Sequence, residues 1–220
     1  MLSGEMDEAQ AYDAFRSTMN EEDTEEKAVI NFDREYSIAL NEKNGRDAAS
    51  SILTTVRVEN NAQLAIAPYY YFTASIYKGE CTSSRVALMT AKSSDTSLYF
   101  AEINGEQVWK LVENYLDHTE NEFSITNQYE LPILSGMKIT VQKEEDGFSL
   151  KDITVDQEEI DKEKEYSILL TDTTRSILEK TIPGCRIKQL QDMTLSSAWT
   201  AFMEKGQQPL APEDYIEVKK

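Results

Sequence analysis

The segment that decides the fold is Ser97-Leu98-Tyr99-Phe100-Ala101-Glu102-Ile103-Asn104-Gly105-Glu106-Gln107-Val108. Its first seven residues alternate between two faces, as residues of a sheet strand do. Asn104 then stands at the N-cap of a helix, and Gln107 occupies the capping-box position three residues later. The apolar residues that follow share one helix face: Val108, Leu111, Val112, Tyr115 and Leu116. The segment therefore predicts a strand that turns directly into a capped amphipathic helix.

Helical and strand patterns alternate on both sides of this unit. We predict helices over 46–57, 174–180 and 194–205, and strands over 64–67, 138–142, 149–155 and 166–170. A turn around Asp146-Gly147 joins the two central strands. This mixture predicts an α+β fold of mixed sheets and packed helices rather than a doubly wound parallel sheet.

The first 27 residues differ in composition from the rest of the chain. They are acidic and poor in large apolar groups, although four residues at helical spacing form one weak apolar stripe: Ala9, Tyr12, Phe15 and Met19. The acidic run at 21–26 is typical of a solvated linker. We predict an acidic N-terminal helix or linker over 1–27 and one domain over 28–220. The first five residues lack the basic and apolar regions of a signal peptide.

The chain carries 40 acidic and 22 basic residues, for a formal net charge of −18. Affinity for nucleic acid comes largely from Lys and Arg, and anionic membranes attract the same residues, so neither is an expected partner. No apolar stretch reaches the roughly 20 residues that span a bilayer, and we expect no direct membrane insertion. With 40% apolar residues, a packed globule is expected.

Residues for catalysis or metal binding are few. The only histidine is His118, which follows the predicted helix and is interpreted as a surface or capping residue. A two-metal phosphoesterase site needs several His, Asp and Asn ligands, which one histidine cannot provide. No Walker loop, dinucleotide-binding glycine pattern or nucleophile elbow is present. We therefore predict no catalytic residue, no metal site and no cofactor in this chain. Cys81 and Cys185 are read as two buried thiols or as one long-range disulfide.

Four successive aromatic residues occur in the segment Pro68-Tyr69-Tyr70-Tyr71-Phe72-Thr73, which follows the predicted strand at 64–67. They cannot all point the same way, so some face the core and others a cleft, a partner or solvent. Two interpretations stay open: packing within the core and loop, or a platform on which a ligand or partner stacks.

Four blocks of sequence, in order and with matching gaps, resemble the C-terminal, substrate-recognition domain of the bacterial 5′-nucleotidase and UDP-sugar hydrolase family. The blocks are Asp47-Ala48 within a helix, 63–67 followed twelve residues later by Gly79-Glu80, the strand and helix of 98–111, and 135–140 with Val155, Ile160-Asp161-Lys162 and Tyr166-Ser167-Ile168. The resemblance covers about residues 28 to 218. It implies that a separate upstream metallophosphoesterase domain holds the divalent metals, and that the protein acts in nucleotide catabolism outside the cell or at its surface.

The chain diverges from this family at the nucleotide-binding positions. In the family's Asn-x-Gly-Gly-x-Arg loop, Pro68 replaces the asparagine, tyrosines replace the glycines and Thr73 replaces the phosphate-facing arginine. The family's base-stacking phenylalanine corresponds to Thr173. The candidate ligand- or partner-binding residues are Tyr69, Tyr70, Tyr71, Phe72, Thr73, Tyr129, Thr173 and Arg175. The resemblance also favours a Cys81–Cys185 disulfide, because both cysteines flank loops that line the family's cleft and family members are exported.

Three hypotheses for function follow. In the first, the chain is a divergent recognition domain that has lost the family's nucleotide contacts and binds another small molecule or another module. In the second, it is the C-terminal part of a surface 5′-nucleotidase-like phosphohydrolase with its catalytic domain upstream. In the third, it is a structural spacer of a cell-surface protein. None of the three expects catalysis from this chain alone, and the sequence does not identify the ligand.

Overall fold

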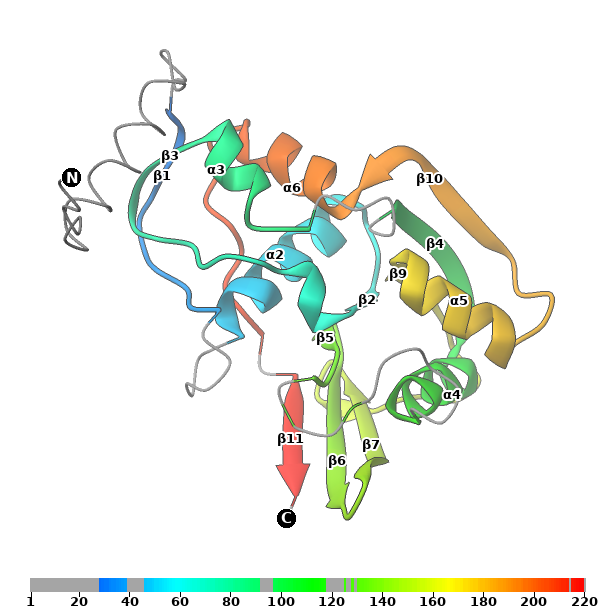
Figure 1. Ribbon diagram of the computed structural model, residues 1–220. Coiled ribbons are helices and arrows are strands. Elements are labelled where there is room, and N and C mark those ends of the chain that lie inside the picture. Colours follow the sequence, from blue (N-terminus) through cyan, green and yellow to red (C-terminus); the bar gives the residue numbers. More distant parts are fainter. Residues whose placement is uncertain are drawn as a thin grey trace, which may run out of the picture.

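The computed structural model describes residues 28–38, 46–91, 97–117, 125, 128, 130–213 and 215–219. The predicted N-terminal helix or linker, His118 and Tyr129 lie outside these ranges. The described residues form three sheets, with strand orders β1-β3, β10-β4-β9-β2-β5 and β11-β6-β7-β8. Helices pack against these sheets, which confirms the predicted α+β class (Figure 1).

The five-stranded sheet lies at the centre of the domain. It comprises β10 (Ile187–Thr194), β4 (Ser97–Asn104), β9 (Glu165–Leu170), β2 (Leu64–Ala67) and β5 (Ile133–Ser135). Strands β2 and β9 run parallel, and the other neighbouring pairs are antiparallel. Helices α2 (Asp47–Glu59) and α5 (Asp172–Thr181) both pack on β2, and all four residues of this strand are buried.

The predicted strand–turn–helix unit is confirmed. Strand β4 leads directly into α4 (Gly105–Leu116), and the five apolar residues of the predicted helix face are buried. Asn104 accepts a 2.9 Å hydrogen bond from the Gln107 backbone, and the Gln107 side chain accepts one of 2.9 Å from the Asn104 backbone. A Cβ atom at Gly105 would lie 2.2 Å from the carbonyl oxygen of Asp161, so only glycine fits at this crossing.

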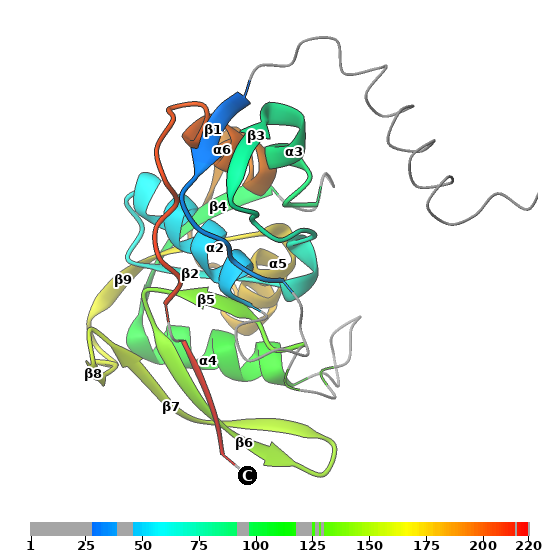
Figure 2. The same ribbon diagram turned by 90° about the vertical axis from the view of Figure 1, so that its left-hand side faces the viewer.

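The third sheet is built on the predicted hairpin. Strands β6 (Lys138–Glu144) and β7 (Gly147–Val155) pair antiparallel, and β8 (Glu158–Glu159) extends the sheet beyond β7. The C-terminal strand β11 (Ile216–Lys219) adds to β6 in parallel. Strands β6, β7 and β11 extend together from one end of the domain (Figures 1 and 2).

The other end of the domain contains elements that the sequence patterns did not predict. Strand β1 (Ala28–Phe32) pairs with β3 (Gly79–Thr82), and α3 (Ser83–Ala87) follows β3 at once. Helix α6 (Leu195–Met203), which was predicted within 194–205, packs against α2 and α3 and buries Trp199 completely. The start of β1 at Ala28 coincides with the predicted beginning of the domain, although the division into 1–27 and 28–220 remains a prediction.

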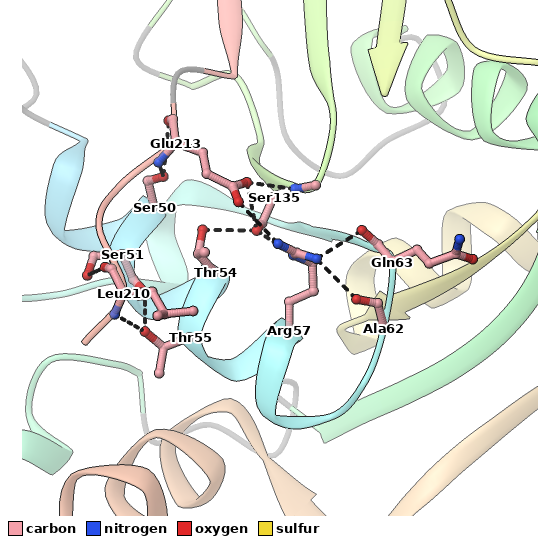
Figure 3. Close-up of polar contacts among 11 residues, drawn as sticks. Ser50, Ser51, Thr54, Thr55, Arg57, Ala62, Gln63, Ser135, Leu210 and Glu213 are labelled. Carbon is pink, nitrogen blue, oxygen red and sulfur yellow. Dashed lines mark hydrogen bonds and ion pairs between the residues drawn. The ribbon is translucent and has the colours of Figure 1, made fainter. Parts of the chain in front are cut away.

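Polar contacts hold the C-terminal segment on α2 (Figure 3). The Glu213 carboxylate accepts hydrogen bonds from Arg57 Nη2 at 3.1 Å, from Ser135 Oγ at 3.1 Å and from the Gly136 backbone at 2.7 Å. Ser135 Oγ also accepts a 2.7 Å bond from Arg57 Nε. Towards the start of the helix, Ser50 Oγ donates to the Glu213 carbonyl and accepts from the Glu213 backbone N–H. The segment before β11 is thus fixed to the helix by side chains rather than by strand pairing.

Candidate functional site

The aromatic segment and the start of α5 meet at one edge of the central sheet. Residues Tyr69–Tyr71 form a short 3₁₀ turn, η1, directly after β2, and α5 begins directly after β9. These two strands are parallel neighbours with Ile66 opposite Leu170, so both chain continuations leave the sheet at the same edge. Thr174 Oγ1 lies 3.3 Å from the Ile66 carbonyl oxygen and ties α5 to the end of β2. This topology brings together residues about a hundred positions apart in the sequence.

Three of the predicted site residues form a hydroxyl cluster. Thr173 Oγ1 lies 2.8 Å from the Tyr71 hydroxyl and 3.3 Å from the Tyr70 hydroxyl. The Tyr70 ring meets the rings of Tyr69 and Tyr71 edge to face, at centroid distances of 5.6 and 5.0 Å. Tyr71 is buried, Tyr69 is half-buried and Tyr70 is 40% exposed. The four residues Tyr69, Tyr70, Tyr71 and Thr173, named the tyrosine surface below, thus present one aromatic side chain to solvent on a packed base.

Tyr115 of α4 is fully buried beneath this surface, although its helical spacing predicted only a position in the core. Burial raises the pKa of the Tyr115 phenol well above its usual value. Electrostatic interactions with Tyr70 and Tyr71 also raise this pKa, whereas the charge of Arg46 lowers it. The buried phenol therefore stays neutral over the physiological range of pH.

Arg175 lies beside the tyrosine surface and is held by two acids. It makes ion pairs of 3.2 Å with Asp172 and 2.6 Å with Glu179, and its guanidinium stacks over the Tyr99 ring at 5.0 Å. Tyr99 donates a 2.9 Å hydrogen bond to Asp172, and burial followed by this bond raises its pKa. The arginine and the two carboxylates together carry a net charge of −1.

Phe72 and Thr73 point to a different part of the fold. Phe72 is buried and pairs with Thr90 through an isolated β-bridge. The Thr73 backbone N–H donates a 3.0 Å hydrogen bond to the Met89 carbonyl oxygen, and Thr73 Oγ1 donates one of 2.7 Å to the Leu88 carbonyl oxygen. These contacts fasten the aromatic segment to the end of α3. The binding role predicted for these two residues remains a prediction, as does that of Tyr129.

The structure does not contain the Cys81–Cys185 disulfide that the family resemblance favours. Both residues are thiols. Cys81 is buried on β3, whereas Cys185 lies in the turn between α5 and β10, which is remote from β3 in Figure 1. The family resemblance suggested that both cysteines lie close to one cleft. In the structure Cys81 belongs to β3, which pairs with β1.

The described ranges contain neither a metal-binding cluster nor a membrane-spanning helix. Among these residues, no group of three or more His, Cys, Asp or Glu side chains is placed to hold a metal ion. No helix in the same part of the chain is long and apolar enough to cross a membrane.

Comparisons with known proteins agree with this architecture. The sequence model of the family described as "5'-nucleotidase, C-terminal domain" matches residues 27–176. No curated protein sequence is significantly similar to the chain. Among solved structures, the 5′-nucleotidase precursor of Thermus thermophilus is 14% identical, with a TM-score of 0.66 over 96% of this chain and 42% of that one. The Haemophilus influenzae NAD nucleotidase is 13% identical, with a TM-score of 0.67 over 97% of this chain and 42% of that one.

A eukaryotic structure is also similar. The Candida albicans 5′-nucleotidase is 10% identical, with a TM-score of 0.53 over 94% of this chain and 44% of that one. At these identities the likeness shows the fold alone, and the chain spans less than half the length of each of these structures. The family model, which matches most of the chain, shows more: the chain belongs to the 5′-nucleotidase C-terminal domain family.

Proposed function

We propose that this chain is a non-catalytic recognition domain, and that the tyrosine surface binds its ligand or partner. The observation that carries the proposal is the convergence of the Tyr70 and Tyr71 hydroxyls on Thr173 Oγ1. These positions correspond, by the resemblance described above, to the glycine loop and the stacking aromatic with which family members grip a nucleotide. By that resemblance, a packed aromatic surface stands where family members have their nucleotide-binding loops.

The chemistry of the surface favours recognition over catalysis. Its polar groups are phenols and one threonine hydroxyl. The hydroxyls of Tyr70 and Tyr71 both hydrogen-bond to Thr173 Oγ1, and a threonine hydroxyl cannot act as a general base near neutral pH. The acids that lie closest in sequence to Thr173 are engaged by Arg175 and Tyr99. An exposed tyrosine ring, by contrast, suits stacking on a sugar, a base or an apolar side chain.

The charges at the surface favour a ligand without a phosphate group. Arg175 is neutralised by Asp172 and Glu179, and the Thr73 hydroxyl is used by the Leu88 carbonyl. A phosphate brought to this surface would meet a net negative charge in a chain whose formal charge is already −18. We therefore expect a neutral or cationic ligand with a flat face and hydrogen-bonding groups.

Titration of the chain with paired ligands tests the proposal. Adenosine against AMP, and glucose against glucose 6-phosphate, differ only in the phosphate, and isothermal calorimetry with thermal-shift measurement reports binding. We expect the neutral member of a pair to bind and the phosphorylated member to bind at least ten-fold more weakly. Tyr70→Ala should weaken binding about ten-fold or more, since stacking contributes about 1–3 kcal/mol.

Tyr77→Ala is the matched control, because Tyr77 is 64% exposed and lies outside the tyrosine surface. Equal effects of the two alanine substitutions would contradict the assignment of the surface. Tighter binding of the phosphorylated ligands would contradict the charge argument. No binding of either pair, or of peptides, would favour the structural-spacer hypothesis.

A second candidate function is the recognition half of an exported phosphohydrolase. It is supported by the family and by the coverage of 42–44% of the relatives' length, which leaves room for the upstream metallophosphoesterase domain that the resemblance implies. That domain would hold the divalent metals and lie outside the cell or at its surface. Hydrolysis of 5′-AMP should be absent with this chain alone and present with a longer chain that carries His and Asp metal ligands upstream. Activity of this chain alone would contradict both candidates.

A further inference from the structure

A second surface feature lies at the opposite end of the domain from the β6–β7 hairpin. Strand β3 and helix α3 line a hollow of about 420 Å³, with Cys81 and Met89 among its buried residues. Two large apolar side chains on its lining face solvent, Tyr77 at 64% and Leu88 at 55% exposed. Exposed apolar side chains grouped around a hollow are typical of an interaction surface.

The charges around this hollow differ from those of the chain as a whole. Lys78 and Arg85 line it against one acid, Glu80. Both cations are exposed, and neither makes an ion pair with another residue in the described ranges. The chain as a whole is acidic, with 40 acidic and 22 basic residues, whereas the lining of this hollow has a net positive charge. Such a lining, which is also partly apolar, is complementary to an acidic segment that carries apolar side chains.

Such a segment is attached beside the hollow. Ala28, the first residue of β1, pairs with Thr82, which is the N-cap of α3. Strands β1 and β3 and helix α3 lie together in both views (Figures 1 and 2). Residues 1–27 enter the fold at this point, and they contain nine acidic and two basic residues together with the apolar stripe of Ala9, Tyr12, Phe15 and Met19.

We propose that the hollow of β3 and α3 binds the acidic N-terminal segment of the same chain, residues 1–27. The seven residues from 21 to 27 reach at most about 23 Å, whereas α3 carries the chain from Thr82 to Leu88 over about 9 Å. The stripe therefore ends within reach of the hollow. A tether of this length gives an effective concentration on the order of millimolar, so a weak contact suffices.

Photo-cross-linking of the full chain tests the proposal. We place p-benzoylphenylalanine at Leu88, and in a control chain at Val58, an apolar residue of α2 that is 43% exposed. Mass spectrometry should find the Leu88 probe joined to a peptide from residues 1–27, with at least a five-fold lower yield from the Val58 probe. In a mixture of ¹⁵N-labelled and unlabelled chains, the cross-linked pairs should come from one chain.

Charge reversal supplies a second readout. Lys78→Glu/Arg85→Glu should lower the Leu88 cross-link at least five-fold. Lys143→Glu/Lys151→Glu, which makes the same change in net charge on the β6–β7 hairpin, should leave it within two-fold.

Three results would overturn the proposal. The first is a Leu88 cross-link to peptides outside 1–27, or no cross-link at all. The second is cross-linking of labelled with unlabelled chains, which would indicate a second copy as the occupant. The third is an equal effect of the two charge reversals on the Leu88 cross-link. Circular dichroism of every variant separates these results from loss of the fold, and the exposed positions chosen make such a loss unexpected.

Discussion

The hydroxyl of Tyr71 lies 2.8 Å from Oγ1 of Thr173, across a sequence separation of 102 residues. The contact exists because β2 and β9 are parallel neighbours whose continuations leave the sheet together. By the family resemblance, these are the two positions at which the family has a glycine and a base-stacking aromatic residue, and here a hydrogen-bonded pair joins them. The departures at these two positions are therefore structurally linked.

The first prediction concerns this pair. Thr173→Val keeps the shape of the side chain but removes the oxygen that the Tyr70 and Tyr71 hydroxyls share. We expect the free energy of unfolding, measured in urea, to fall by about 1 kcal/mol, the usual contribution of a hydrogen bond. Thr200→Val, at a half-buried position of α6 away from this surface, is the control and should change stability less. Equal losses would contradict a stabilising role for the pair.

The second prediction concerns the anchor of the C-terminal segment. Glu213→Ala removes the carboxylate that binds Arg57, Ser135 and the Gly136 backbone. The Arg57 side chain is largely buried, so the loss leaves a desolvated charge without its anion. We expect a cost of about 2 kcal/mol in the free energy of unfolding, below the 3–5 kcal/mol of a fully buried pair.

Glu217→Ala provides the comparison for this change. Its pair with Lys138, at 3.4 Å, is exposed at both partners, and such pairs contribute about 0–1 kcal/mol. Urea unfolding of both variants should therefore separate them by at least about 1 kcal/mol. A smaller difference would mean that water replaces the Glu213 carboxylate at Arg57 with little loss of stability.

Local signals predicted the parts of the fold that depend on neighbours in sequence. The N-cap Asn104 and its partner Gln107 stand three residues apart, and the alternation before them marks β4, so both elements were found with nearly their final bounds. The hairpin of β6 and β7 was found for the same reason, through its turn at Asp146-Gly147.

The parts that were missed depend on distant partners. Strands β1 and β3 are short and pair across about fifty residues, and neither carries a periodic pattern of its own. Arg57 and Glu213 lie 156 residues apart, so nothing in the sequence around either one indicates the contact. Tyr99, Asp172 and Arg175 meet only because β4 and β9 are neighbours. The family resemblance selected Thr173 and the tyrosines, but it also suggested a disulfide that this structure, in which both cysteines are thiols, does not contain.

The third prediction separates two costs of replacing glycine. Gly136 and Gly206 both have positive φ angles, of 76° and 69°. A Cβ atom at Gly136 would lie 2.0 Å from the Gln63 carbonyl oxygen, whereas at Gly206 it would meet nothing within 4 Å. Gly206→Ala should cost about 1 kcal/mol, for the left-handed backbone alone. Gly136→Ala should cost at least about 2 kcal/mol more, because the carbonyl must also move. Thermal or urea unfolding of the two variants measures the difference, and similar values would contradict the close approach.

The fourth prediction concerns the reactivity of Cys185. Burial, and to a smaller extent the charge of Glu179, raise the pKa of this thiol above its usual value of 9.0. Alkylation requires the thiolate, so the rate of reaction with iodoacetamide should reach half its maximum at a pH above 9. Since the folded state holds the proton more tightly than the unfolded state, this group's contribution to stability is present below pH 9. It is lost as the pH rises through the folded pKa.

Glu179→Gln isolates the electrostatic part of this shift. Removing the carboxylate should lower the pH at half-maximal alkylation of Cys185 while leaving it above 9, because burial is the larger cause. Glu158→Gln, which makes the same change in charge on the exposed strand β8, should leave the profile unchanged. Peptide mass spectrometry resolves Cys185 from Cys81 in the same sample. A profile that matches a small-molecule thiol, or that ignores Glu179→Gln, would show that the turn before β10 opens to solvent more than the structure indicates.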